Sequence, residues 1–238
     1  MAVCTRTFRV AADRGWGRLP IDQVVVAVAR SFVGLPYKAK GLERPGDESL
    51  IVDFSGLDCT TFVESSLALA RCIRLHQPTF AAFERELTAI RYRDGRIDQY
   101  PSRLHYFSDW IHEGDRQGRV DDVTAAIGGT PHPLRLTFMT LHPQAYQALR
   151  NPAYVTAMQA IEKTISARPY HFLPKQAIPK TGDRIHPGDV IAITTNVPGL
   201  DISHVGFAVT GDDGNLHLLH APALGRKIEI TREPLAAA

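Results

Sequence analysis

Cys59 is the residue of this 238-residue chain whose type and position point most directly to chemistry. It follows Asp58, a residue type that caps helix N-termini, and precedes Thr60 and Thr61. We therefore predict that Cys59 is the first residue of a helix. There the helix dipole and free backbone N–H groups favour a thiolate and can stabilise an oxyanion. Position alone does not separate such a nucleophile from a small buried hydrophobic side chain, the role of most lone cysteines.

Two histidines, His204 and His220, flank a segment of strong turn formers, Thr210 to Asn215. The midpoint between them, position 212, falls inside this turn, so a hairpin closed there would place the histidines opposite each other on adjacent strands. Opposed side chains have Cβ atoms roughly 4.5–5.5 Å apart, close enough for one imidazole to orient the other. A cysteine nucleophile, a histidine base and an orienting group form the general pattern of a catalytic triad.

Small residues on the first of these strands would bring the helix of Cys59 close to the histidines. Gly206 and Ala208 share the His204 face of a strand, because side chains alternate between its faces. We expect the helix to pack closely against that face. His217 is an odd number of residues from His220 and therefore faces the other side.

Zinc is the main rival explanation for Cys59, His204 and His220, since cysteine and histidine are its ligands. The sequence contains no Cys-x-x-Cys pair and no His-Glu-x-x-His motif, and it shows no fourth ligand. Cys72 would lie about 20 Å from Cys59 along the helix, so it cannot share the site. We expect no metal and no organic cofactor.

The elements that must position these residues follow from hydrophobic periodicity. Helices are predicted at 21–32, 59–75, 80–90, 104–113 and 154–168. Short strands are predicted at 189–194, 204–209, 216–220 and 227–230. Helices followed by a strand meander predict an α+β fold, in which the helices pack on an antiparallel sheet.

Composition and charge are those of an ordinary globular protein, with 44% hydrophobic and 22% charged residues. The formal net charge of +2 gives no dominant basic field, so nucleic acid is not an expected partner. We expect a single domain, 1–238, with its core in about 21–75 and 183–231 and a largely helical insertion at about 78–170.

Targeting signals are weak in this sequence. No apolar run approaches the length of a membrane span, and residues 1–20 lack a signal-peptide core. We expect a cytoplasmic protein, or one of the cell envelope or periplasm if an export signal has been removed.

Three segments resemble the NlpC-type papain-like cell-wall hydrolases: Leu57–Glu64 around the cysteine, Asp201–Gly206 around the first histidine, and Leu219–Pro222 around the second. The chain order in that superfamily is Cys, His and a third polar residue, often His. A closer resemblance is to its N-acetylmuramoyl-L-alanine amidase-like branch. The segments that carry it are Val33–Tyr37, Tyr106–Ile111 and Gly188–Ile191.

The resemblance implies a papain-like core, in which the Cys-bearing helix packs on the antiparallel sheet and additional helices shape the groove. It implies Cys59 as nucleophile, His204 as general base and acid, and His220 as the orienting third member. Four further residues are expected to contact the substrate: Tyr37, Asp58, Ser203 and Trp110. Core packing at helical spacing is the competing explanation for Trp110.

The implied activity is hydrolysis of the amide between N-acetylmuramic acid and L-alanine in muropeptides, through a thioester intermediate. The expected partners are therefore peptidoglycan fragments. Two alternatives stay open. One is a γ-D-glutamyl-diamino acid endopeptidase, in which Asp58 would bind a free L-alanine amine. The other is a non-catalytic module that binds muropeptides or zinc.

Overall fold

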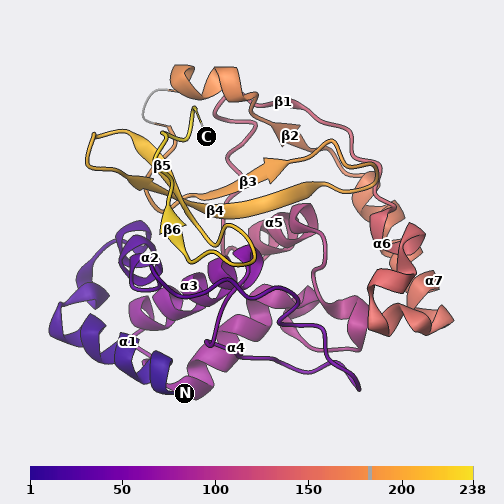
Figure 1. Ribbon diagram of the computed structural model, residues 1–238, viewed down its shortest axis with the longest axis horizontal. Helices are drawn as coiled ribbons and strands as arrows, with labels where there is room; N and C mark the ends of the chain where they lie inside the picture. Colours follow the sequence, from indigo (N-terminus) through magenta and orange to yellow (C-terminus); the bar gives the residue numbers. More distant parts are fainter. Residues whose placement is uncertain (182–183, 238) are drawn as a thin grey trace.

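The computed structural model describes residues 1–181 and 184–237. A four-stranded antiparallel sheet, in the order β3–β4–β5–β6, carries helices on one face and a two-stranded ribbon, β1–β2, over the other (Figure 1). The helices are α1 (Ala2–Asp13), α2 (Ile21–Arg30), α3 (Cys59–Arg74), α4 (Phe80–Arg91), α5 (Phe107–Arg116), α6 (Phe138–Leu141) and α7 (Pro152–Ser166). The strands are β1 (Thr130–Pro131), β2 (His171–Phe172), β3 (Val190–Thr194), β4 (Ile202–Thr210), β5 (Leu216–His220) and β6 (Glu229–Ile230). Short 3₁₀ helices connect them: η1 (Trp16–Arg18), η2 (Arg93–Gly95), η3 (Tyr100–Ser102), η4 (Pro143–Ala145), η5 (Gln147–Arg150) and η6 (Lys175–Lys180).

The predicted α+β class is confirmed, and α3, α4 and β5 lie within a residue of their predicted positions. Helix α5 begins three residues later than predicted. Helix α1 was not predicted, although its buried residues Cys4, Phe8 and Ala11 follow a helical spacing. The predicted core segment 183–231 begins in the pair 182–183, and the predicted domain ends at residue 238; these three residues lie outside the described part of the chain.

Helix α3 is the centre of the helical layer and is buried on nearly every side. It packs between α2 and α4 and against strand β4. Phe62 of α3 meets Phe207 of β4 edge to face, with ring centroids 5.6 Å apart. A helix enclosed in this way has little freedom to move, so its first residue, Cys59, has a fixed place relative to the sheet. In the described part of the chain, no helix has the length and apolar composition that crossing a bilayer requires.

The two faces of the sheet belong to different cores. In β4, Val205, Phe207 and Val209 face the helical layer, while Ala208 faces the opposite side. In β5, Leu219 faces the helices, and its neighbour Leu218 faces away from them. This alternation follows from the two-residue period of a strand. From the bulge onward, the side chains of His204 and Ala208 therefore lie on the face away from α3.

A second lobe, built from α6, α7 and the segments around them, has a hydrophobic core of its own (Figure 1). Its central polar contact joins α7 to the start of α5. The hydroxyl of Tyr106 donates to Glu162 at 2.7 Å and accepts from the backbone N–H of Met139 at 3.0 Å. The lobe thus packs beside the sheet as part of the same structure, within the stretch predicted as a helical insertion.

A buried ion pair connects α3 to the end of α4. Arg91 Nε donates to Glu64 Oε2 at 2.7 Å, and the two side chains are only 2% and 1% exposed. Arg91 also donates to the backbone carbonyl of Ile51 at 2.7 Å, in the segment that leads toward Cys59. The pair therefore fixes both the helix and the chain that enters it.

We expect Glu64→Gln to lower the free energy of unfolding by about 3–5 kcal/mol, because the Arg91 charge would stay buried without its counter-charge. Urea unfolding measures this loss. Asp94→Asn, which removes the exposed partner of Arg116, is the control and should have a much smaller effect. Equal effects of the two substitutions would contradict a structural role for the buried pair.

Candidate active site

The start of helix α3 is closed by a reciprocal cap. The backbone N–H of Thr61 donates to the Asp58 carboxylate at 2.8 Å, and the backbone N–H of Asp58 donates to the Thr61 hydroxyl at 3.0 Å. Cys59 is therefore the first helical residue, as the sequence predicted. Its side chain is partly exposed, whereas Cys4 and Cys72 are buried.

The sulfur of Cys59 sits where strand pairing stops. The last pair between β4 and β5 is Gly206 with His220. The N–H and C=O of Ala208 both bond to the segment that leads into β3. Backbone groups alternate in direction along a strand, so the N–H of Val205 points toward β5. In the described part of the chain, β5 offers this N–H no pairing residue. The Cys59 sulfur contacts this N–H. The thiol therefore lies one residue along the chain from His204, at the edge of the strand.

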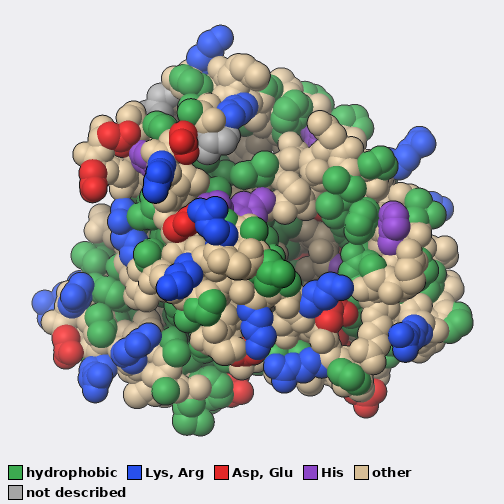
Figure 2. All heavy atoms as spheres, viewed as in Figure 1, with side chains coloured by type: hydrophobic (Ala, Val, Ile, Leu, Met, Phe, Trp, Pro, Cys, Tyr) green, Lys and Arg blue, Asp and Glu red, His purple; other side chains and the backbone are tan. Residues whose placement is uncertain are grey.

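The two predicted histidines form a direct hydrogen bond. His204 Nε2 and His220 Nδ1 are 2.6 Å apart, and the rings meet edge to face. Because His204 Nε2 bonds to His220, Nδ1 is the ring nitrogen of His204 that can accept a proton from a thiol. Histidine side chains gather near the centre of the face shown in Figure 2, beside a hollow in the surface.

The register of the hairpin differs from the prediction. His204 and His220 are diagonal neighbours, because Thr210 pairs with Leu216 and the turn is centred on position 213 instead of 212. Gly206 stands directly opposite His220. A Cβ atom added at Gly206 would lie 2.7 Å from the Leu219 carbonyl oxygen and 3.0 Å from His220 Cβ. The missing side chain leaves the room in which the diagonal imidazoles meet.

The predicted role of Gly206 and Ala208 in helix packing is wrong. Helix α3 packs on the opposite face, against Val205, Phe207 and Val209. The error arises because the histidines and the thiol were assumed to meet across one face. In the structure the thiol lies beside the backbone N–H of Val205, the residue after His204 in strand β4.

Burial controls the protonation states of the site. Burial and the neighbouring Asp58 carboxylate raise the pKa of Cys59, against a lowering contribution from the Val205 N–H. Burial lowers the pKa of His204, and burial together with the charges of His204 and Arg226 lowers that of His220 to about 4. The expected resting thiolate is therefore not favoured: a neutral thiol beside neutral imidazoles is.

Tyr37 and Ser203, two residues expected to contact the substrate, both lie near the site. Tyr37 is half-buried, and its backbone N–H donates to the Arg226 carbonyl at 2.9 Å. Burial raises the pKa of Tyr37, and the charges of Cys59 and Asp58 raise it further, which places the phenol close to the thiol. Ser203 is exposed beside the bulge that precedes His204.

Trp110, also expected to contact the substrate, lies in the core. It is 2% exposed, and its ring stacks on Phe107 with centroids 4.6 Å apart. Its helical spacing already indicated core packing, and the structure shows that packing.

Sequence reasoning missed two contributors to the site. Val205 acts through its backbone N–H, which leaves no trace in residue type. Arg226 is exposed, yet its charge lowers the pKa of His220 and its carbonyl holds Tyr37 in place. Its position six residues beyond His220 was the available signal. Within residues 1–181 and 184–237, no group of three or more His, Cys, Asp or Glu side chains is arranged to hold a metal ion.

Residues 27–237 match the AmiA-like family, described as N-acetylmuramoyl-L-alanine amidase-like, and the chain belongs to this family. It is 40% identical to an N-acetylmuramoyl-L-alanine amidase from Bacteroides uniformis, over 91% of this chain and 92% of that one, with a TM-score of 0.85. It is 44% identical to a Bacteroides fragilis protein named as a candidate xylanase, over 89% and 93% of the two chains, with a TM-score of 0.83. A Legionella pneumophila protein of the DUF1460 family shares the fold at 18% identity, over 97% and 86% of the two chains, with a TM-score of 0.71. Among curated proteins, none matches the chain.

We expect Gly206→Ala to separate the imidazoles and to lower the free energy of unfolding by about 1–3 kcal/mol, because the new methyl group overlaps His220 and the Leu219 carbonyl. Nitrogen NMR of the histidine rings should show loss of the His204–His220 hydrogen bond. Gly41→Ala is the control, since a methyl group there meets open space. Unchanged ring signals in Gly206→Ala would show that the glycine is not needed for the contact.

Proposed function

We propose that this chain is a cysteine-dependent amidase that hydrolyses the bond between the lactyl carbonyl of N-acetylmuramic acid and L-alanine in muropeptides. One observation carries the proposal. A thiol at the first position of a helix contacts the strand residue next to His204, and His204 is oriented by His220 at 2.6 Å. Family membership and the amidase name of the Bacteroides uniformis relative support the choice of bond.

Acylation begins from the neutral pair. His204 Nδ1 accepts the thiol proton as the Cys59 sulfur attacks the lactyl carbonyl carbon, which gives a tetrahedral oxyanion. Backbone N–H groups at the start of α3 donate to this oxygen. The imidazolium then gives the proton to the L-alanine nitrogen, the C–N bond breaks, and a thioester to Cys59 remains. His220, which stays neutral, keeps the His204 ring oriented throughout.

Deacylation uses the same residues, with water in place of the amine. His204 takes a proton from water, and the resulting hydroxide attacks the thioester carbonyl. Collapse of the second tetrahedral intermediate breaks the C–S bond and releases the lactyl carboxylic acid. The proton on His204 returns to the sulfur, so the enzyme is restored with one water consumed for each amide hydrolysed.

We further propose that the core is the papain-like core of the NlpC-type hydrolases. The chain order of the proposed catalytic residues, Cys59, His204 and His220, supports this assignment. So does a cysteine-bearing helix packed on an antiparallel sheet. The likeness to the Legionella pneumophila protein concerns the fold alone.

The site geometry favours the amidase over the two other activities in view. An endopeptidase would need Asp58 to bind a free amine through Oδ2, since Oδ1 accepts the Thr61 N–H at 2.8 Å as the helix cap, and the family match supports the amidase over this alternative. Glycoside hydrolysis, which the name of the Bacteroides fragilis relative suggests, typically uses two carboxylates. The groups gathered here are a thiol and two imidazoles.

We expect Cys59→Ala to abolish product formation from a disaccharide–tripeptide muropeptide, because no other group in the mechanism can form the thioester. Mass spectrometry of the wild-type digest should show the free disaccharide together with the intact stem peptide. Cys72→Ala, a change at a buried cysteine remote from the site, is the control and should keep its activity. Release of an L-alanyl-D-glutamate dipeptide would identify the endopeptidase instead, and an inactive folded wild type would leave only the binding module.

The acid limb of kcat/KM should have its midpoint below pH 6.5. Protonated His204 cannot accept the thiol proton, and burial lowers the pKa of this imidazole, so the active neutral form persists to lower pH than for a free histidine. A pH profile with the muropeptide substrate measures this limb. A midpoint above pH 7 would contradict an imidazole base whose pKa is lowered by burial.

A further inference from the structure

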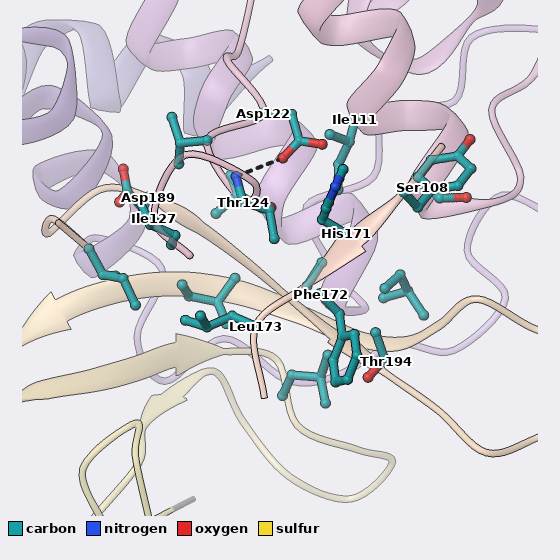
Figure 3. A pocket seen from close by; sticks show the side chains of 18 of the residues that line it. Ser108, Ile111, Asp122, Thr124, Ile127, His171, Phe172, Leu173, Asp189 and Thr194 are labelled. Atoms are coloured by element: carbon teal, nitrogen blue, oxygen red, sulfur yellow. Dashed lines mark hydrogen bonds between the residues drawn. The ribbon is translucent and has the colours of Figure 1, made fainter. Parts of the chain in front are cut away.

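An apolar cavity of about 340 Å³ follows the free edge of strand β3 (Figure 3). Six consecutive residues, 189–194, line it. Because successive side chains of a strand point to opposite faces, six in a row indicate that the cavity follows the strand edge. Leu218 of β5 shows that it also extends over the sheet face away from α3. Strand β3 ends the sheet, so among residues 1–181 and 184–237 no strand pairs with this edge. The aliphatic walls are Ile111, Val123, Ile127, Leu134, Leu173, Ile178, Ile185, Val190, Ile191, Ala192, Ile193, Ile202, Leu218 and Leu235.

One end of the cavity carries buried polar groups. Ser108 is 5% exposed, and its hydroxyl lies beside Tyr170 and Asp201 without a well-formed hydrogen bond to either. The buried Tyr170 hydroxyl lies near the Arg168 guanidinium, and among the described residues it too lacks a well-formed hydrogen bond. Asp201 itself is occupied, because it accepts the Ser108 backbone N–H at 2.7 Å at the start of α5. Two hydroxyls that can donate or accept are thus available to a ligand.

The lining selects a neutral, aliphatic ligand. A carboxylate head would face Asp201 at the polar end, and Asp122 and Asp189 also line the cavity. The nearby cations are already engaged: Lys175 donates to the Ala237 carbonyl at 3.0 Å, and Arg168 pairs with Asp109 at 2.6 Å. A sugar would leave several hydroxyls without partners against aliphatic walls. An amide satisfies both requirements, since its carbonyl can accept from one hydroxyl and its N–H can donate to the other.

We propose that this cavity binds an aliphatic amide of about eight carbons, with its chain along β3 and its head between Ser108 and Tyr170. The cavity adjoins the imidazole pair on the same face of the sheet. Ile193 pairs with His204 across the strands, and Leu218 is two residues before His220. Its lining contains none of Cys59, His204 and His220, so it is a separate site that does not depend on the proposed activity.

Calorimetric titration with octanamide tests this site on the full-length chain. The wild type should bind with Kd on the order of 0.1 mM, as expected for burying its apolar chain. Ile127→Trp places an indole in the cavity and should weaken binding at least about tenfold. Ile127 lies on the far wall from the sheet (Figure 3). Val33→Trp adds the same indole to an exposed position outside the cavity and should bind like the wild type.

Ser108→Ala tests the polar end, because it removes the unpartnered hydroxyl and keeps the backbone N–H that Asp201 accepts. It should weaken octanamide about threefold to tenfold. Octanoate should bind the wild type more weakly than octanamide. If Ile127→Trp does not fold, Leu173→Trp fills the same cavity. Absence of octanamide binding, unchanged affinity in a folded filling variant, or displacement of octanamide by N-acetylmuramic acid would overturn the proposal.

Discussion

The point at which β4 and β5 stop pairing organises the whole site. Within the described residues, strand pairing ends at Gly206 and His220, so the N–H of Val205 faces no neighbouring strand. The sulfur of Cys59 lies beside this N–H instead. The thiol thus lies beside a backbone N–H at the point where strand pairing stops. The same ending of β5 lets His220 reach diagonally to His204, so one local feature sets both halves of the site.

Rigid surroundings hold the Cys59 thiol beside the Val205 N–H. Helix α3 is enclosed by α2, α4 and β4, its first turn is closed by Asp58 and Thr61, and its interior is tied to α4 by the Glu64–Arg91 pair. None of these groups carries out chemistry. Together they hold a thiol against a strand edge with little freedom, which is the condition that proximity and orientation place on catalysis.

Burial makes the site a neutral one at rest. It raises the pKa of the thiol and lowers those of both imidazoles, which favours the uncharged form of all three groups. The two faces of the sheet also have different surroundings. One face forms the main core with α3, and the other face carries the imidazole pair beside an apolar cavity along β3. The imidazole pair and the apolar cavity are therefore neighbours on one face without sharing a residue.

Much of the fold and of the candidate site could be predicted from the sequence. Asp58, Cys59 and Thr61 specify a capped helix start by local hydrogen bonding alone, and alternation with a turn specifies the hairpin that carries His204 and His220. Local chemistry does not fix the register of that hairpin to one residue, and it misplaced the face on which α3 packs. Those two features depend on contacts between segments some 150 residues apart, such as Phe62 with Phe207 and Cys59 with Val205. Residue types therefore determined which groups could react, and only tertiary packing decided how they meet, because a strand edge becomes available only where its neighbour ends.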